Sequence, residues 1–235
     1  MKKLIITLVV CIFSTVLIAQ VSTSERQILI DLYTSTNGEN WSHSWDLNKT
    51  ISEWHGITTE DNKITSISLL FNNMTGELPA SIGELEHLEI LELSFNKLHG
   101  PIPTEIGNLK NLKIIAFNGN DLTGNIPSSL GNLTKLSQLH LSSNLLTGKL
   151  PETLVNLNKL EVLNVFDNNL SGKIPYQFAY TRNLRELIVA ENNFEASTEF
   201  SALLLSNGAS INLDINQNVS PKAQDIIAIE SEEEN

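Results

Sequence analysis

Side chains able to do catalytic or metal chemistry are few in this chain, and their spacing fits no familiar arrangement. The five histidines, at positions 43, 55, 87, 99 and 140, include no two that are two or four residues apart, as two metal ligands on one strand or helix would be. The sequence contains no Gly-rich phosphate loop, no dinucleotide fingerprint and no Ser/His/Asp arrangement. We therefore expect a protein that is not an enzyme and that binds no cofactor and no metal.

One stretch partly matches a calcium-binding loop. DINQNVSPKAQD, from Asp214 to Asp225, has oxygen-bearing side chains at loop positions one, three, five and twelve. Val219 stands where such a loop needs glycine for its sharp turn. Asn216 also continues a series of asparagines at 24-residue intervals, which gives it a structural role instead. The stretch therefore does not predict calcium binding.

The amino-terminal segment indicates export. MKKLIITLVVCIFSTVLIAQ has two lysines, an apolar run and the small residue Ala19, which together predict a secretory signal peptide over residues 1–19. The only cysteine, Cys11, lies within it, so the exported protein would contain no disulfide. We expect a secreted or cell-surface/periplasmic protein with no integral membrane segment after signal removal. The net charge of −12 argues against nucleic acid as a partner.

The elements that position the remaining side chains follow from a strict internal repeat. Asparagine recurs every 24 residues, and a period of this length is typical of solenoids, in which each unit covers the apolar edge of its neighbour. The members of this asparagine ladder are Asn72, Asn96, Asn120, Asn144, Asn168 and Asn192.

Apolar residues recur eight, five and three positions before each asparagine, as in Leu112, Ile115 and Phe117. The last two have the period of two that predicts a short strand with alternate side chains buried. After each asparagine an apolar residue follows at plus two. Five copies then have glycine at plus four and Leu-Pro or Ile-Pro at plus six and seven. The repeated unit is therefore a strand followed by a tight turn.

This LxxLxLxxNxLxGxIPxxLGxLxx pattern resembles the plant-type extracellular leucine-rich repeats of receptor-kinase ectodomains and polygalacturonase-inhibitor-like proteins. The resemblance covers residues 64–196. It implies an α/β solenoid, a right-handed superhelix of about six 24-residue repeats with a parallel concave sheet. It also implies that each ladder asparagine turns inward and binds backbone groups of its own turn and of the adjacent repeat. Ser52 and Thr59 stand where the plant proteins have cysteines, which favours a bacterial exported member.

A solenoid needs closed ends, so we expect a cap on each side of the repeats. Residues 24–36 have helical apolar spacing behind Ser24, and they begin an amino-terminal cap over residues 20–63. The repeats pass at residue 197 into a degenerate last repeat and carboxy-terminal cap, residues 197–220. This segment would contain a short helix and a seventh strand near 211–213. Residues 221–235 would form a flap and an acidic tail.

The concave side of the sheet is the expected recognition surface. Glu92 and His140 share a row there but lie two repeats apart, about 10 Å, which is beyond hydrogen-bond reach. Neighbouring repeats would bring Phe71 next to Phe95 and Asp167 next to Glu191. The candidate ligand-binding residues are Phe71, Glu92, Phe95, His140, Asn164, Phe166, Asp167 and Glu191.

These residues favour an exported recognition protein that binds a protein or peptide, because aromatic anchors and charged contacts are typical of such interfaces. One alternative is a structural or adhesive cell-surface protein without a defined soluble partner. A more remote alternative is an ice-binding solenoid. Thr75, Thr123, Thr147 and Ser171 recur at plus three, although His99 interrupts the row.

Overall fold

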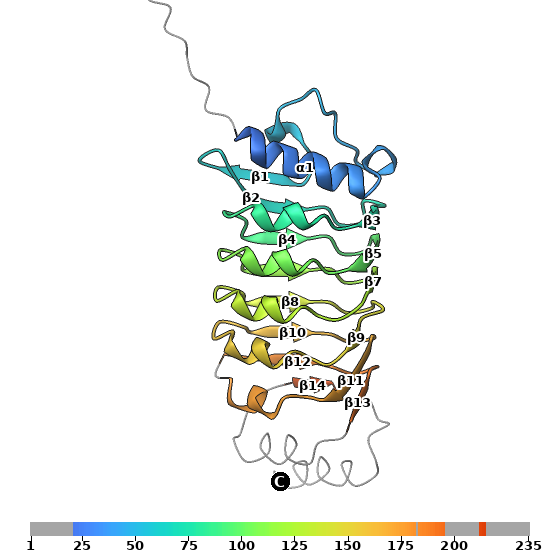
Figure 1. The fold of residues 1–235 in the computed structure, drawn as a ribbon, viewed down its shortest axis with the longest axis vertical. Helices are drawn as coiled ribbons and strands as arrows, with labels where there is room; N and C mark the ends of the chain where they lie inside the picture. Colours follow the sequence, from blue (N-terminus) through green and yellow to red (C-terminus); the bar gives the residue numbers. More distant parts are fainter. Residues whose placement is uncertain (1–20, 182, 196–211, 215–235) are drawn as a thin grey trace, which may run out of the picture.

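The protein is a stack of coils with a long sheet along one side (Figure 1). The computed structural model describes residues 21–181, 183–195 and 212–214. Each coil contributes one strand to an eight-stranded sheet, in which β1 is antiparallel to β2 and every later pairing is parallel. The strands, in spatial order, are β1 (Ile57–Glu60), β2 (Lys63–Ser68), β4 (Ile90–Glu92), β6 (Ile114–Ala116), β8 (Gln138–His140), β10 (Val162–Asn164), β12 (Glu186–Ile188) and β14 (Asn212–Asp214).

The register of the long sheet equals the sequence period. Ile67 lies opposite Leu91, and Leu91 lies opposite Ile115, so residues 24 apart are direct neighbours. These three side chains are fully buried, and the residues on either side of them are mostly part-exposed. The alternation that predicts strands in the sequence therefore puts one face of the sheet into the core and leaves the other open.

Two shorter parallel sheets follow the asparagine turns on a second flank of the stack (Figure 1). These sheets were not predicted from the sequence. Their segments of two to five residues are too short, and too rich in polar residues and Gly, for an alternating pattern to reveal a strand. The first sheet contains β3 (Thr75–Glu77), β5 (Lys97–Pro101) and β7 (Asp121–Thr123); the second contains β9 (Thr147–Gly148), β11 (Asn169–Lys173) and β13 (Asn193–Glu195).

The side opposite the long sheet consists of one short 3₁₀ helix per coil. Each begins directly after the proline of the Leu-Pro or Ile-Pro pair, whose fixed φ suits the residue before the first turn. The helices are η3 (Ala80–Glu84), η4 (Thr104–Asn108), η5 (Ser128–Asn132), η6 (Glu152–Asn156) and η7 (Tyr176–Tyr180).

Three coils have a second glycine, Gly83, Gly107 and Gly131, and later coils have Val155 and Ala179 at the same position. None of the three glycines has positive φ, so no left-handed backbone requires glycine there. A Cβ on Gly131 would nevertheless lie 2.5 Å from the backbone oxygen of Thr153 in the next coil. In these three coils the next coil therefore approaches too closely for a side chain, a cause that sequence reasoning did not identify.

Helix α1 (Thr23–Ser35) lies across the amino-terminal end of the stack (Figure 1). Its N-cap is Ser22, whose hydroxyl accepts a hydrogen bond from the Glu25 backbone at 3.2 Å, and not Ser24 as the sequence analysis expected. Two more 3₁₀ turns, η1 (Gly38–Asn40) and η2 (Ile51–Glu53), follow the helix. The N-cap therefore lies two residues before the expected one, because the side chain of either serine can supply the capping oxygen.

Aromatic rings fill this end in place of a disulfide. Trp45 stacks on Trp54 with ring centroids 4.7 Å apart, and it meets Trp41 edge-on at 4.8 Å. The guanidinium of Arg26 lies 4.7 Å from the centre of the Trp54 ring. All three indole N–H groups donate to backbone oxygens, so these large side chains are buried without an unpaired donor.

At the other end, β14 pairs with β12, which confirms the strand expected near 211–213. The expected signal peptide (1–19), the short helix expected within 197–220, and the expected flap and tail (221–235) lie outside the described residues. The stretch 214–225 that partly matches a calcium-binding loop also lies outside them, apart from Asp214. Among the described residues, no helix is long and apolar enough to cross a membrane.

Candidate functional site

The candidate site is the open side of the long sheet. We define the sheet face as the residues six, four, two and one positions before each asparagine of the ladder. Side chains at minus six and minus four alternate with buried ones along each strand, as in Ile90 and Glu92 on either side of the fully buried Leu91. The parallel register sets equivalent side chains of successive coils side by side.

The asparagine ladder holds the turn at the edge of this face. In each coil from Asn96 to Asn192, the side-chain oxygen accepts a backbone N–H of the preceding coil. The side-chain nitrogen of Asn120 donates to the backbone oxygens of Leu93, Phe117 and Asn118 at 3.0–3.3 Å. Asn72 differs, because its oxygen accepts from His43 N and its side-chain nitrogen has no partner in the described part of the chain.

The residue before each asparagine has a left-handed backbone in all six coils, with φ between 51° and 63°. Glycine adopts this conformation freely, but only one of the six residues is glycine. A non-glycine residue there costs about 1–2 kcal/mol, so the backbone of the five non-glycine residues at this position reduces stability. The six residues are Phe71, Phe95, Gly119, Ser143, Asp167 and Glu191.

Phe71 and Phe95 form an exposed aromatic pair on the sheet face. Their rings are parallel to within 6° with centroids 4.6 Å apart, and they are 66% and 48% exposed. Gly119 continues the row, and a Cβ there would lie 2.8 Å from Cδ1 of Phe95. The Phe95 ring therefore leans over the one coil whose residue at this position has no side chain.

An aliphatic row at minus six is a part of the face that sequence reasoning missed. Ile90, Ile114 and Val162 are half-buried, and Ile90 lies directly opposite Ile114 in the sheet. Ala116, two residues beyond Ile114, is buried on the same face. The strand alternation contained this signal, because the residues flanking a buried position must point outward, but isoleucine there was not recognised as surface.

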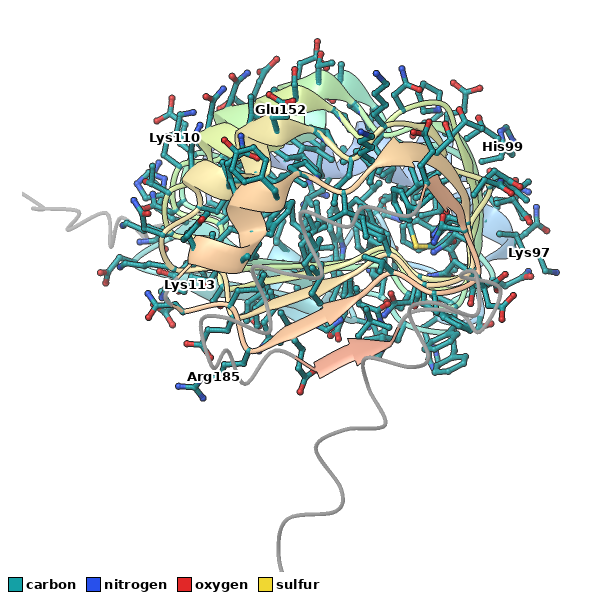
Figure 2. The ribbon with its side chains drawn as sticks, turned by 90° about the horizontal axis from the view of Figure 1, so that it is seen from below. Lys97, His99, Lys110, Lys113, Glu152 and Arg185 are labelled. Carbon is teal, nitrogen blue, oxygen red and sulfur yellow. The ribbon has the colours of Figure 1, made fainter. Side chains whose placement is uncertain are left out.

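The charge of the sheet face is one-sided. Its 24 positions include no lysine or arginine, and they include the four carboxylates of Glu92, Asp167, Glu186 and Glu191. Figure 2 shows cationic side chains elsewhere: Lys97 on β5 of the first short sheet, and Lys113 and Arg185 directly before strands β6 and β12 of the long sheet. A ligand of this face therefore meets negative potential with no cationic side chain within the face.

His140 occupies the middle of the face. Burial lowers the pKa of His140 below its usual range, although the carboxylates of Glu186 and Glu92 act in the opposite direction. Its Nε2 lies 3.3 Å from Oε1 of Gln138, two residues earlier on the same strand. Glu92 accepts a hydrogen bond from the Ser68 hydroxyl at 2.7 Å. We therefore expect neutral imidazole at neutral pH.

The remaining predicted residues lie on later coils. Asn164 is half-buried, and its side-chain oxygen accepts the backbone N–H of Phe166 at 3.0 Å. Phe166 is also half-buried, while Asp167 and Glu191 are exposed. The structure thus brings Phe71 and Phe95 into contact and separates them from the acidic residues by intervening coils.

A histidine pair was missed altogether. The rings of His43 and His55 stack with centroids 4.4 Å apart near the first coil. They lie twelve residues apart in an irregular segment, so no periodic signal relates them. No group of three potential metal ligands occurs among the described residues.

Comparisons with known proteins identify the repeat. A family model described as a leucine-rich repeat region matches residues 80–206. The search of curated proteins gave no significant match. Among solved structures, PEPR1–AtPEP1 is 32% identical with a TM-score of 0.72. The match covers 83% of this chain and 28% of the PEPR1–AtPEP1 chain.

Two further structures are similar. A plant ice-binding protein is 27% identical with a TM-score of 0.74, over 84% of this chain and 64% of its own. The ectodomain of GASSHO1/SCHENGEN3 from Arabidopsis thaliana, in complex with CASPARIAN STRIP INTEGRITY FACTOR 2, is 27% identical with a TM-score of 0.71. The match covers 81% of this chain and 24% of the receptor chain. The chain thus spans about a quarter of each receptor chain and under two thirds of the ice-binding protein.

The family match covers more than half of the 235 residues, and the solved structures share the same stacked architecture. The chain belongs to the leucine-rich repeat family, with repeats of the plant type.

Proposed function

We propose that this protein is an exported, non-catalytic recognition module that binds a protein or peptide through its sheet face. The observation that carries the proposal is the exposed aromatic pair at one end of an anionic, partly aliphatic face. Exposed apolar side chains grouped on a folded surface are typical of interaction sites. The similar receptor structures support it, because PEPR1 is solved with AtPEP1 and GASSHO1/SCHENGEN3 with CASPARIAN STRIP INTEGRITY FACTOR 2.

Ile114→Lys tests the proposal, because it places a long cationic side chain at the centre of the face. The control is Ser128→Lys in η5, an exposed position on the opposite side of the coil. Tagged mature proteins are incubated with medium from the cells that produce them, and bound proteins are quantified by mass spectrometry. We expect at least one partner that both wild type and Ser128→Lys retain and that Ile114→Lys loses at least tenfold. Equal retention by all three proteins would reject the sheet face as the binding site.

Export itself rests on residues 1–19, and it predicts a mature protein that begins at Gln20. Amino-terminal sequencing of protein recovered outside the cytoplasm checks this. An intact Met1 on the exported protein would contradict it.

A second candidate function is ice binding, which the similarity to a plant ice-binding protein favours. Thr123, Thr147 and Ser171 are exposed on successive strands of the short sheets. The same flank also carries the exposed charges of Lys97 and Asp121, which interrupt a flat hydroxyl surface. Thermal hysteresis in a dilute solution of the mature protein would establish this function, and its absence would reject it.

The structural or adhesive alternative predicts self-association without a soluble partner. Analytical ultracentrifugation of the mature protein distinguishes an adhesive function from recognition of a soluble partner. A concentration-dependent oligomer that Ile114→Lys leaves unchanged would favour adhesion over recognition.

A further inference from the structure

We propose that the ligand is an extended peptide that runs across the coils, with an apolar side chain on the aromatic pair and a basic side chain between Asp167 and Glu191. This inference rests on the proposed function and adds the chemistry and spacing of the ligand. We call Asp167 and Glu191 the acidic pair. The proposal requires an apolar contact, an anionic contact and a fixed distance between them.

The apolar contact is provided by the aromatic pair. Phe71 and Phe95 stack on each other and still expose 66% and 48% of their surface, so a large ring area faces water. Ile90 and Ile114 extend the apolar surface across the neighbouring strands. Aromatic rings held by stacking lose little conformational freedom when a ligand covers them, which makes them suitable anchors.

The anionic contact is provided by the acidic pair. The backbone N–H of Asn168 donates to the backbone oxygen of Glu191 at 3.0 Å, so the turns that carry Asp167 and Glu191 are adjacent. Outside the face, carboxylates that precede the strands have cations beside them: Glu89 with Lys113, and Glu161 with Arg185 at 3.9 Å.

The acidic pair, by contrast, has no ion-pair partner among the described residues. Glu186 adds a third exposed carboxylate on the same coil as Glu191. A basic ligand side chain would therefore supply the charge that the protein does not.

The distance between the two contacts fixes the length of the ligand. The midpoints of the aromatic pair and the acidic pair are four coils apart. Neighbouring parallel strands are about 4.8 Å apart, so the separation is about 19 Å. An extended chain advances about 3.3 Å per residue, so this distance corresponds to about six residues. Side chains six residues apart also point to the same side of an extended peptide, as simultaneous contact requires.

The left-handed turn position allows the test to separate binding from folding. Phe71, Phe95, Asp167 and Glu191 all have φ between 51° and 58°, a conformation that glycine adopts without strain. Replacing any of them by glycine removes the side chain and keeps the turn. The control is Asp61→Gly, which removes an exposed carboxylate from a residue with φ of 47° in the turn between β1 and β2.

The experiment selects random twelve-residue peptides displayed on phage against the mature wild-type protein. Dissociation constants of enriched synthetic peptides are then measured for wild type, Phe71→Gly/Phe95→Gly, Asp167→Gly/Glu191→Gly and Asp61→Gly. We expect enriched peptides to contain an aromatic or large aliphatic residue and an Arg or Lys about six positions apart. Each double variant should weaken binding at least tenfold, and Asp61→Gly less than twofold.

A substitution in the peptide, combined with the protein variants, gives a double-mutant cycle that measures the contact between the peptide Arg and the acidic pair. Arg→Gln in the peptide should cost at least tenfold on wild type but less than twofold on Asp167→Gly/Glu191→Gly. Enriched peptides without this spacing, or an Arg→Gln cost that persists on that variant, would overturn the inference. If enriched peptides that contradict the inference still bind Ile114→Lys less tightly than wild type, the sheet face remains the binding site. The proposed function then stands without the inference on ligand chemistry and spacing. Peptides that bind Ile114→Lys and both double variants as tightly as wild type would reject the proposed function as well.

Discussion

At the residue scale, the left-handed turn position is where stability and recognition oppose each other. Phe95 adopts φ of 58°, which is unfavourable for a bulky side chain. We predict that Phe95→Gly keeps the free energy of unfolding within about 1 kcal/mol of wild type, because relief of the turn offsets the lost stacking. Phe95→Val loses the same stacking but keeps the strain, so it should be less stable than Phe95→Gly by about 1–2 kcal/mol. Urea denaturation measures both, and a glycine variant less stable than the valine variant would contradict this account.

The asparagine ladder is sensitive to a change of one atom. In Asn120→Asp, one oxygen still accepts the Leu98 N–H, but the group that donated to three carbonyl oxygens becomes an acceptor. We expect the free energy of unfolding to fall by about 2–4 kcal/mol, because buried acceptors lose their donor and a charge is buried. Asn169→Asp, exposed on β11, is the matched control and should change it by less than about 0.5 kcal/mol. Equal effects of the two substitutions on urea denaturation would be inconsistent with the ladder.

His140 makes part of the stability depend on pH. Because burial lowers its pKa in the folded protein, the folded state binds a proton less readily than the unfolded chain. Its contribution is therefore fully present above the unfolded pKa of about 6.5 and is lost as the pH falls below it. Glu92 and Glu186 reduce the effect without reversing it. His140→Gln should show a smaller loss of unfolding free energy between pH 7.5 and 5.5 than wild type, and an unchanged loss would exclude His140 as the cause.

At the scale of the elements, close approach between coils sets the cost of a single methyl group. The Cβ introduced by Gly131→Ala would lie 2.5 Å from the backbone oxygen of Thr153. We expect a loss of about 1–3 kcal/mol, because backbone on both sides must shift. The reverse change in a later coil, Ala179→Gly, removes a methyl from the equivalent position and should cost less than about 1 kcal/mol. Thermal unfolding compares them, and equal tolerance would refute the close approach.

The strands of the long sheet were predictable because their pattern repeats with the coil. Ile67, Leu91 and Ile115 are buried at the same position of successive coils, so each repeat supports the assignment of the others. The short sheets gave no comparable signal, because their pairing depends on coil-to-coil distance and not on which side chains they bury. The N-cap at Ser22 was missed because serines 22 and 24 are chemically equivalent.

The candidate site was predictable only where neighbouring coils decide contact. Phe71 and Phe95 were expected to meet, since residues 24 apart are adjacent in the sheet, and their rings stack. The His43–His55 stack depends on an irregular segment that no period constrains. The tilt of Phe95 over Gly119 depends on side-chain conformation, which sequence alone does not determine.

At the scale of the whole molecule, the stack places aromatic side chains near one end of the sheet face and acidic side chains near the other. Because equivalent positions of successive coils lie side by side, a one-dimensional series of residues becomes a surface that changes from aromatic to acidic. The ends of that surface are four coils apart, so a small ligand reaches only one of them. We therefore expect the ligand to lie lengthwise across the coils.

Photo-crosslinking tests this arrangement most directly. An enriched peptide carries a benzophenone side chain either in place of its apolar residue or next to its basic residue. We predict that the first probe crosslinks to the coils of Phe71 and Phe95 and the second to the coils of Asp167 and Glu191. Crosslinks of both probes to one coil, or to the 3₁₀ helices on the opposite side, would contradict the account.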